Sequence, residues 1–224
     1  MPRMQDFTRY AVYCAPQPGI FADRTAAWLG WDLAHGRTVD DPALPARPVG
    51  QPRKYGFHGT IRAPFHPVVP ETDLIAAVDA LAGDRPAVEC GTLALRDLDG
   101  FLALMPTDGE PALVALADAV VRATDPLRAP LTPDQIARRR PDSLTPRQRD
   151  LLDRWGYPFV MEEFRFHLTL TDRLSPAEKP AVQAAAQAWL GPVLPDPFVI
   201  SDLCLVAEDA QGRFHLRHRA PLSG

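Results

Sequence analysis

Two stretches of the chain alternate apolar and polar positions in nearly the same order: FHGTI at 57–61 and FHLTL at 166–170. Alternation with a period of two is typical of a strand that buries one face. The phenylalanine and aliphatic residues of each stretch then face the core, and the histidine and threonine share the opposite face. We therefore predict two strands, over 57–65 and 162–174, with matching polar faces. The residues on these polar faces are His58, Thr60, His167 and Thr169.

The rest of the pattern predicts further strands and helices. Runs rich in β-branched and aromatic residues predict strands, and apolar residues three or four positions apart predict helices. The dipeptides Asp99-Gly100 and Gln211-Gly212 predict hairpin turns. We expect a strand over 8–16, a proline-rich loop over 38–56, helices over 19–33, 71–83, 110–126 and 175–191, a short helix after Thr145, and hairpins over 87–106 and 198–221.

One order of elements occurs twice: a motif strand, then a helix, then a hairpin. The spacing also agrees, since 32 residues separate His58 from Cys90 and 31 separate His167 from Phe198. Such agreement indicates a duplicated unit. We expect one bilobal domain over 1–224, with motif halves at about 50–126 and 161–221 and a linker or flap at about 127–160.

Composition narrows the class of protein. Hydrophobic residues make up 46% and charged residues 23% of the chain, as in ordinary soluble globular proteins. A formal charge of -4 gives no bulk attraction for nucleic acid or a membrane surface. The N-terminal stretch has no signal-like apolar segment, and no apolar run approaches the roughly 20 residues of a membrane span. We therefore expect a cytoplasmic protein without a membrane partner.

Cysteine usage and missing motifs weaken several interpretations. The three cysteines lie far apart without CxxC spacing, which argues against a disulfide framework and against a zinc site. Buried free thiols are the preferred interpretation. The sequence has no P-loop, no GxSxG and no HExxH motif, so the usual kinase, serine-hydrolase and zincin assignments lack support.

The repeated polar face suits chemistry on a phosphodiester. Histidine is the natural acid–base residue near neutral pH, and two histidines across a cleft can divide the two proton transfers. The two threonine hydroxyls can donate to phosphate oxygens as charge builds on them. Arg62 and Arg165 have the parity to join the same faces and bind the phosphate. No metal ion or other cofactor is required.

These residues also carry a resemblance to a known family. Paired H-x-T motifs, each on a strand of a two-lobed repeat, resemble the 2H phosphoesterase superfamily, which includes the bacterial RNA ligase/cyclic phosphodiesterase proteins. The wider segments YGFHGTIRAPF and RWGYPFVMEEFRFHLTLT resemble its DUF1045-like branch, whose members are associated with phosphonate-metabolism operons. The resemblance covers most of the chain.

The resemblance implies a fold and an activity. The implied fold is α+β, with two lobes related by a pseudo-twofold, each an antiparallel sheet with helices on its outer face, and a central groove between them. The implied activity is metal-independent cleavage or ligation of a cyclic phosphodiester: a 2′,3′-cyclic nucleotide or RNA end, or a ribose cyclic phosphate from phosphonate breakdown. The implied active set is His58, Thr60, His167 and Thr169. We expect a monomer with a small phosphorylated substrate.

Other interpretations stay open. The same groove suits a non-catalytic module that captures a phosphorylated ligand or an RNA end, and scattered histidines suit a metal-dependent hydrolase. The basic segment at 137–141 is either a solvated helix face or a flap that steers an anionic substrate. RNA is the less favoured ligand because no aromatic platform accompanies these arginines. The sequence does not assign the acid and base roles to the two histidines.

Overall fold

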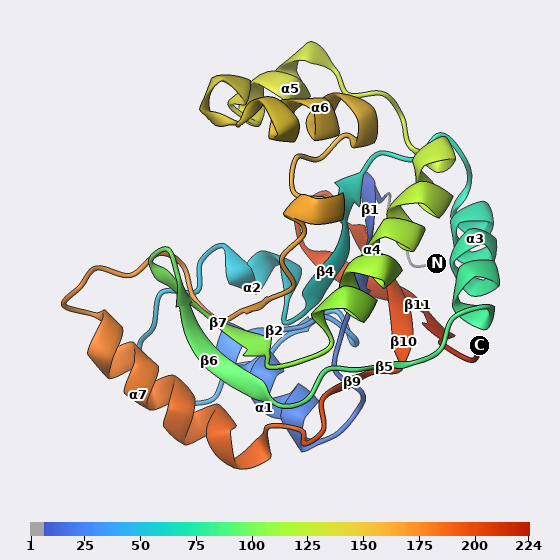
Figure 1. Cartoon of the computed structure of the whole chain (residues 1–224). Helices are drawn as coiled ribbons and strands as arrows, with labels where there is room; N and C mark the ends of the chain where they lie inside the picture. Colours follow the sequence, from blue (N-terminus) through green and yellow to red (C-terminus); the bar gives the residue numbers. More distant parts are fainter. Residues whose placement is uncertain (1–6) are drawn as a thin grey trace.

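A seven-stranded antiparallel sheet is the centre of the computed structural model, which describes residues 7–224 (Figure 1). The strand order is β11-β10-β1-β4-β8-β7-β6. Its strands are β1 (Arg9–Cys14), β4 (Gly59–Phe65), β6 (Leu93–Leu98), β7 (Phe101–Pro106), β8 (Leu168–Thr169), β10 (Asp202–Glu208) and β11 (Phe214–Pro221). Two small ribbons pair β2 (Trp31–Asp32) with β3 (Arg37–Thr38) and β5 (Val88–Glu89) with β9 (Val199–Ile200).

The two motif strands are neighbours in this sheet. Strand β4 pairs with β8 through Gly59 and Leu168. The hairpin that follows the first motif, β6–β7, pairs with β8 of the second motif, whereas β10–β11 joins β1, the strand beside β4. Each hairpin therefore lies on the other motif's side of the sheet. The α+β class with an antiparallel sheet is confirmed, and the division into two motif halves stays a prediction.

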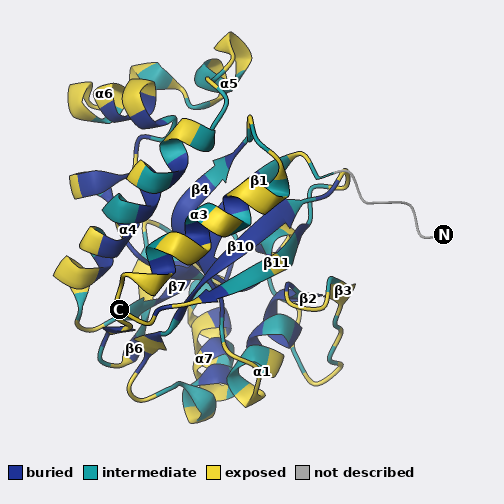
Figure 2. Ribbon diagram, turned by 90° about the vertical axis from the view of Figure 1, so that its right-hand side faces the viewer, coloured by how far each residue is buried: buried dark blue, intermediate teal, exposed yellow. Residues whose placement is uncertain are grey.

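The longer helices, α1, α3, α4 and α7, share one hydrophobic core with the apolar face of the sheet. Helices α3 and α4 pack on β4, β10 and β11 (Figure 2), and α1 packs against α7. In α4 the apolar residues recur three or four positions apart, and these are the buried ones: Leu113, Leu116, Ala117, Val120 and Val121. The helices are α1 (Ile20–Leu29), α2 (Pro52–Tyr55), α3 (Glu71–Gly83), α4 (Glu110–Thr124), α5 (Pro133–Arg138), α6 (Pro146–Trp155) and α7 (Lys179–Leu190).

The segment that the sequence assigned to a linker or flap folds into α5, α6 and short helical turns at one end of the molecule (Figure 1). Each of these two helices begins at a capping box. The Thr145 hydroxyl accepts from the Gln148 backbone N–H, and the Gln148 side chain accepts from the Thr145 N–H. Thr132 and Gln135 repeat the arrangement at α5. The predicted start of the helix after Thr145 is confirmed.

Several predicted boundaries are wrong. The first helix ends at Leu29, because Gly30 adopts a left-handed conformation with φ 78° before β2 begins. The last helix begins at Lys179 rather than Ser175, whose hydroxyl instead hydrogen-bonds the Glu178 carboxylate in a preceding turn. The second motif strand is only Leu168–Thr169, much shorter than the predicted 162–174.

No helix among residues 7–224 is long and apolar enough to cross a membrane. Part of the N-terminal stretch that lacks a signal-like segment, residues 1–6, lies outside the described residues. The three cysteines are free and buried, as predicted.

Candidate active site

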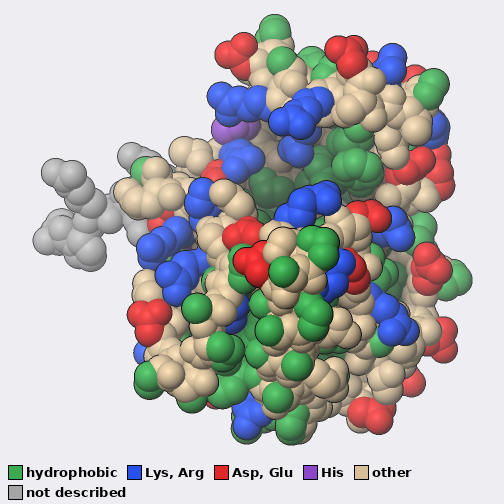
Figure 3. Space-filling view, turned by 90° about the vertical axis from the view of Figure 1, so that its left-hand side faces the viewer, with side chains coloured by type: hydrophobic (Ala, Val, Ile, Leu, Met, Phe, Trp, Pro, Cys, Tyr) green, Lys and Arg blue, Asp and Glu red, His purple; other side chains and the backbone are tan. Residues whose placement is uncertain are grey.

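A cleft of about 490 Å³ is lined by the histidine and threonine of both motifs. It lies on the polar face of β4 and β8, between the tip of the β6–β7 hairpin and the segment around α5. Figure 3 shows this side of the molecule as a hollow with a hydrophobic floor and Lys and Arg side chains around its rim. The predicted residues that line the cleft are His58, Thr60, His167, Thr169 and Arg165.

The strand register brings the two motifs together. Gly59 lies opposite Leu168 in an antiparallel pair. Continuing that register by one residue on each side sets His58 opposite Thr169 and Thr60 opposite His167. Residues that face each other across antiparallel strands have Cβ atoms about 4.5–5.5 Å apart. Each histidine therefore has the threonine of the other motif as its cross-strand neighbour.

His58 is held in a fixed orientation and tautomer. Its Nδ1 lies 3.0 Å from the Gly56 carbonyl oxygen, and its Nε2 lies 3.1 Å from the Thr60 hydroxyl. A carbonyl oxygen only accepts, so Nδ1 carries the proton and Nε2 is left as the acceptor. The Tyr13 ring stacks on the imidazole at a centroid distance of 3.5 Å, and Tyr55 meets it edge-on at 5.2 Å.

Burial keeps the His58 ring neutral. The residue is only 8% exposed. Loss of hydration is the main cause that lowers the pKa of His58 to about 3; the Gly56 hydrogen bond opposes this shift and the nearby His167 adds to it. A neutral imidazole whose Nε2 is an acceptor, here of the Thr60 hydroxyl, is the form that general base catalysis requires.

His167 repeats this arrangement in a more open setting. Its Nδ1 lies 2.8 Å from the Arg165 carbonyl oxygen, two residues before it, as Gly56 is two residues before His58. The ring is half-buried, with Phe101 at a centroid distance of 5.8 Å. In the described part of the chain, no hydrogen bond reaches its Nε2. The same backbone contact thus holds Nδ1 of both histidines and leaves Nε2 as the ring nitrogen available for chemistry in the cleft.

The two predicted arginines separate. Arg165 lines the cleft and is exposed. Arg62 does not line it, because the pairing of β1 with β4 shifts register twice between Thr60 and Phe65. Each shift inserts an extra residue into β4 and breaks the simple alternation of faces. The Arg62 side chain lies instead in an adjacent pocket.

Aromatic residues form much of the cleft wall, and the sequence did not single most of them out. Of the two tyrosines on the first strand, Tyr13 lines the cleft, whereas the Tyr10 hydroxyl hydrogen-bonds Glu71. Burial raises the pKa of Tyr55 to about 12, so its hydroxyl keeps its proton and can donate. The other aromatic residues of the wall are Phe101, Tyr157, Phe159, Phe164 and Phe214.

The remaining histidines lie outside the cleft in local polar contacts. Their partners are the Asp32 carboxylate for His35, the Thr8 carbonyl for His66, Asp209 for His215 and Asp79 for His218. Over residues 7–224, no three His, Cys, Asp or Glu side chains are grouped as metal ligands would be.

The buried His58 predicts a specific loss of stability in acid. Its folded pKa lies below the value of about 6.5 expected in the unfolded chain, so only the unfolded chain takes up this proton between pH 7 and pH 5. We expect this residue to lower the free energy of unfolding by about 2 kcal/mol at pH 5. Urea unfolding at both pH values measures the loss in wild type, in His58→Gln and in the control His35→Gln. Equal losses in wild type and His58→Gln would contradict the assignment.

Comparison with known proteins gives relatives of greater length. The chain is 34% identical over 235 residues to the ribose 1,5-bisphosphate phosphokinase PhnN of Janthinobacterium sp. (strain Marseille), a match over 98% of this chain and 52% of that protein. It is 38% identical over 212 residues to the protein of the same name from Laribacter hongkongensis (strain HLHK9), over 91% of this chain and 49% of that protein. The chain therefore spans about half the length of these relatives.

Among solved structures, the chain is similar to E. coli LigT complexed with 3′-AMP, with 15% identity and a TM-score of 0.47 over 98% of this chain and 100% of that one. It is also similar to a structure described as a phosphoesterase, with 16% identity and a TM-score of 0.46 over 97% of this chain and 99% of that one. A family model described as "Protein of unknown function (DUF1045)" matches residues 60–215, from Thr60 of the first motif through the whole second motif. The chain belongs to the DUF1045 family.

Proposed function

We propose that the protein is a phosphoesterase that opens a cyclic phosphodiester by general acid–base catalysis with His58 and His167. The observation that carries this proposal is the repeated geometry of the two rings. Both line one cleft, and in both Nδ1 is bound to the carbonyl oxygen two residues earlier, so that Nε2 is the atom of each ring that can exchange a proton with substrate or water. Nε2 of His58 accepts from the Thr60 hydroxyl. This arrangement suits a reaction in which one proton is taken and another is given.

Burial suggests how the roles divide. His58 is neutral and its Nε2 is an acceptor, so it is the base. His167 is half exposed and opens towards the cleft, so we assign it the role of the acid. The negative charge of a bound phosphodiester favours the protonated form of the His58 ring, which strengthens His58 as a base once substrate is present.

The proposed reaction uses one water molecule. His58 Nε2 takes a proton from this water as the water oxygen bonds to phosphorus. The bond from phosphorus to one ribose oxygen breaks, and His167 protonates that oxygen. The product is a phosphomonoester beside a free hydroxyl, and the two histidines return to their starting forms by proton exchange with solvent. Thr60, Thr169 and Arg165 hold the phosphate oxygens as negative charge increases on them.

The named relatives support a sugar phosphate as the substrate class. Their name assigns them an activity on ribose 1,5-bisphosphate, and this chain aligns with about half of each. The present sequence has no GxxxxGK[ST] motif, so we assign the phosphokinase activity of the relatives to their other half. We therefore favour a ribose cyclic phosphate over an RNA end, with phosphonate breakdown as the setting that the family resemblance implies.

A substrate panel tests the proposed function. Nucleoside 2′,3′-cyclic phosphates and ribose cyclic phosphates are incubated with the protein in the presence of a metal chelator, and phosphorus NMR follows the conversion of diester to monoester. We expect turnover of at least one ribose cyclic phosphate. Tight binding without turnover would favour the second candidate, a phosphate-binding module in the same cleft. Binding by such a module would survive His58→Ala better than a change at Arg165.

A further inference from the structure

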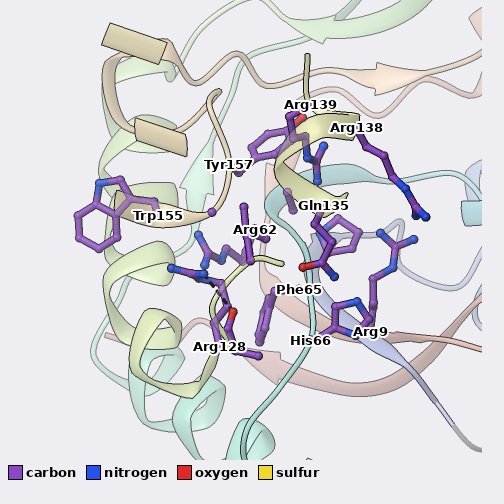
Figure 4. A pocket seen from close by; sticks show the side chains of 15 residues that line it. Arg9, Arg62, Phe65, His66, Arg128, Gln135, Arg138, Arg139, Trp155 and Tyr157 are labelled. Carbon is purple, nitrogen blue, oxygen red and sulfur yellow. Dashed lines mark hydrogen bonds between the residues drawn. The ribbon is translucent and has the colours of Figure 1, made fainter. Parts of the chain in front are cut away.

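A second pocket of about 400 Å³ adjoins the catalytic cleft (Figure 4). Its lining includes residues 62–66 of β4 and the segment that follows it, and residues 128, 129 and 131 of the segment after α4. The pocket and the cleft share part of their lining, so no layer of buried core residues lies between them. The residues that line both of them are Arg9, Ala63, Pro64, Arg139 and Tyr157.

Arg62 lines this pocket and is buried without satisfied hydrogen bonds. It is 1% exposed, and among the described residues none of its three guanidinium nitrogens has a hydrogen-bond partner. Its closest anion is Asp125, whose Oδ1 lies 3.6 Å from a terminal nitrogen, and its guanidinium lies over the Phe65 ring at 5.4 Å. A buried charge with unused donors is costly, and such a group in a native fold indicates a missing partner.

The other groups around the pocket also select an anion. Five arginines line it, and no Asp or Glu is among its described lining residues. Two of them are already oriented by carboxylates outside the lining: Arg9 by Glu208, and Arg128 by Asp125 at 3.1 Å. Figure 4 shows Arg62 and Arg128 on one side of the pocket and Arg9 and Arg138 on the other. The planar fork of guanidinium donors matches the oxygens of a phosphate or a carboxylate in pairs, and several arginines around one space suit the higher charge of a phosphate.

We propose that this pocket binds a second phosphate of the same substrate, a pentose or nucleoside that carries a phosphomonoester besides its cyclic phosphodiester. The inference rests on the proposed function and narrows its substrate class. Arg62 donates to the phosphomonoester, and Arg138 and Arg139 on the α5 segment close over it. Because Ala63, Pro64 and Tyr157 line both spaces, one small molecule can contact both. The basic segment at 137–141 thereby gains a role in substrate binding.

The test uses pairs of substrates that differ only in the phosphomonoester. One pair is adenosine 2′,3′-cyclic phosphate with and without a 5′-phosphate, and the other is a ribose cyclic phosphate with and without a 5-phosphate. We expect wild type to prefer the phosphorylated member in kcat/KM by at least about tenfold, the effect of one charge-assisted contact. In Arg62→Met this preference falls towards one, and in the exposed Arg138→Met it is reduced.

The matched control is Arg149→Met, which removes an equal charge from an exposed α6 residue that lines neither space and is expected to keep the wild-type preference. Wild type that hydrolyses both members equally would overturn the second-phosphate site but leave the proposed function intact. If neither member is hydrolysed, the proposed function fails, and calorimetry with ribose 5-phosphate then tests the second-phosphate site independently of catalysis. Binding by wild type that is lost in Arg62→Met supports the site, and absence of binding by wild type refutes it.

Discussion

His167→Ala is expected to lose about 10²–10⁴-fold in kcat on a ribose cyclic phosphate, the usual range for one general acid or base. It should lose far less on thymidine 3′-(p-nitrophenyl phosphate), because p-nitrophenolate leaves without a proton. His58→Ala should lose a similar factor on both substrates, since activation of water is needed in both reactions. Release of p-nitrophenolate and phosphorus NMR measure the two rates.

This prediction separates the acid from the base, which the sequence alone does not. The control is His35→Ala, an exposed histidine paired with Asp32 outside the cleft, and it should keep wild-type rates on both substrates. An equal loss for His167→Ala on the two substrates would show that it is not the acid. Full activity in either cleft variant would remove the two-histidine mechanism altogether.

Gly59→Leu, which makes the first motif resemble the second, is expected to abolish most activity. A Cβ at Gly59 would lie 2.2 Å from Cζ and 2.4 Å from Cε2 of the Phe166 ring, far inside normal contact. The buried Phe166 ring would have to move, next to the one backbone pair between β4 and β8 in the described residues and between the histidine and threonine of the first motif. We expect a loss of roughly 1–3 kcal/mol in stability and at least about a hundredfold in kcat/KM.

Gly83→Ala is the matched control, because nothing lies within 4 Å of its Cβ position. It lies in the last turn of α3 and should be neutral or slightly stabilising. Thermal melting and the ribose cyclic phosphate assay compare the two variants. A Gly59→Leu protein that melts and turns over like wild type would mean that the Phe166 ring moves without cost and that the packing at Gly59 does not position the histidines.

Local pattern was sufficient for the parts of the site that depend on a single strand. Alternation identified the shared faces of His58 with Thr60 and of His167 with Thr169, and all four line the cleft. It failed at Arg62 because the register shifts that redirect this side chain come from pairing with β1, a strand about 50 residues earlier in the chain. A bulge of this kind leaves little trace in the sequence of the bulged strand.

Contacts between distant segments account for the rest of what the sequence did not predict. The hairpin after each motif joins the other motif's side of the sheet, although spacing alone suggested that each half was self-contained. Arg139 and Tyr157 reach the cleft only because α5 and α6 fold over its edge. Their residue types indicated no more than a basic, proline-rich segment, since the docking of a short helix depends on the surface that receives it.

Phosphorus NMR of a ribose cyclic phosphate, with chelator present throughout, tests the central claim most directly. Wild-type protein is predicted to convert the cyclic diester signal to a monoester signal, and the double variant His58→Ala/His167→Ala to leave it at the rate of buffer alone. A diester signal unchanged by wild type across the whole panel of cyclic phosphates would contradict the account. So would conversion by the double variant at the wild-type rate.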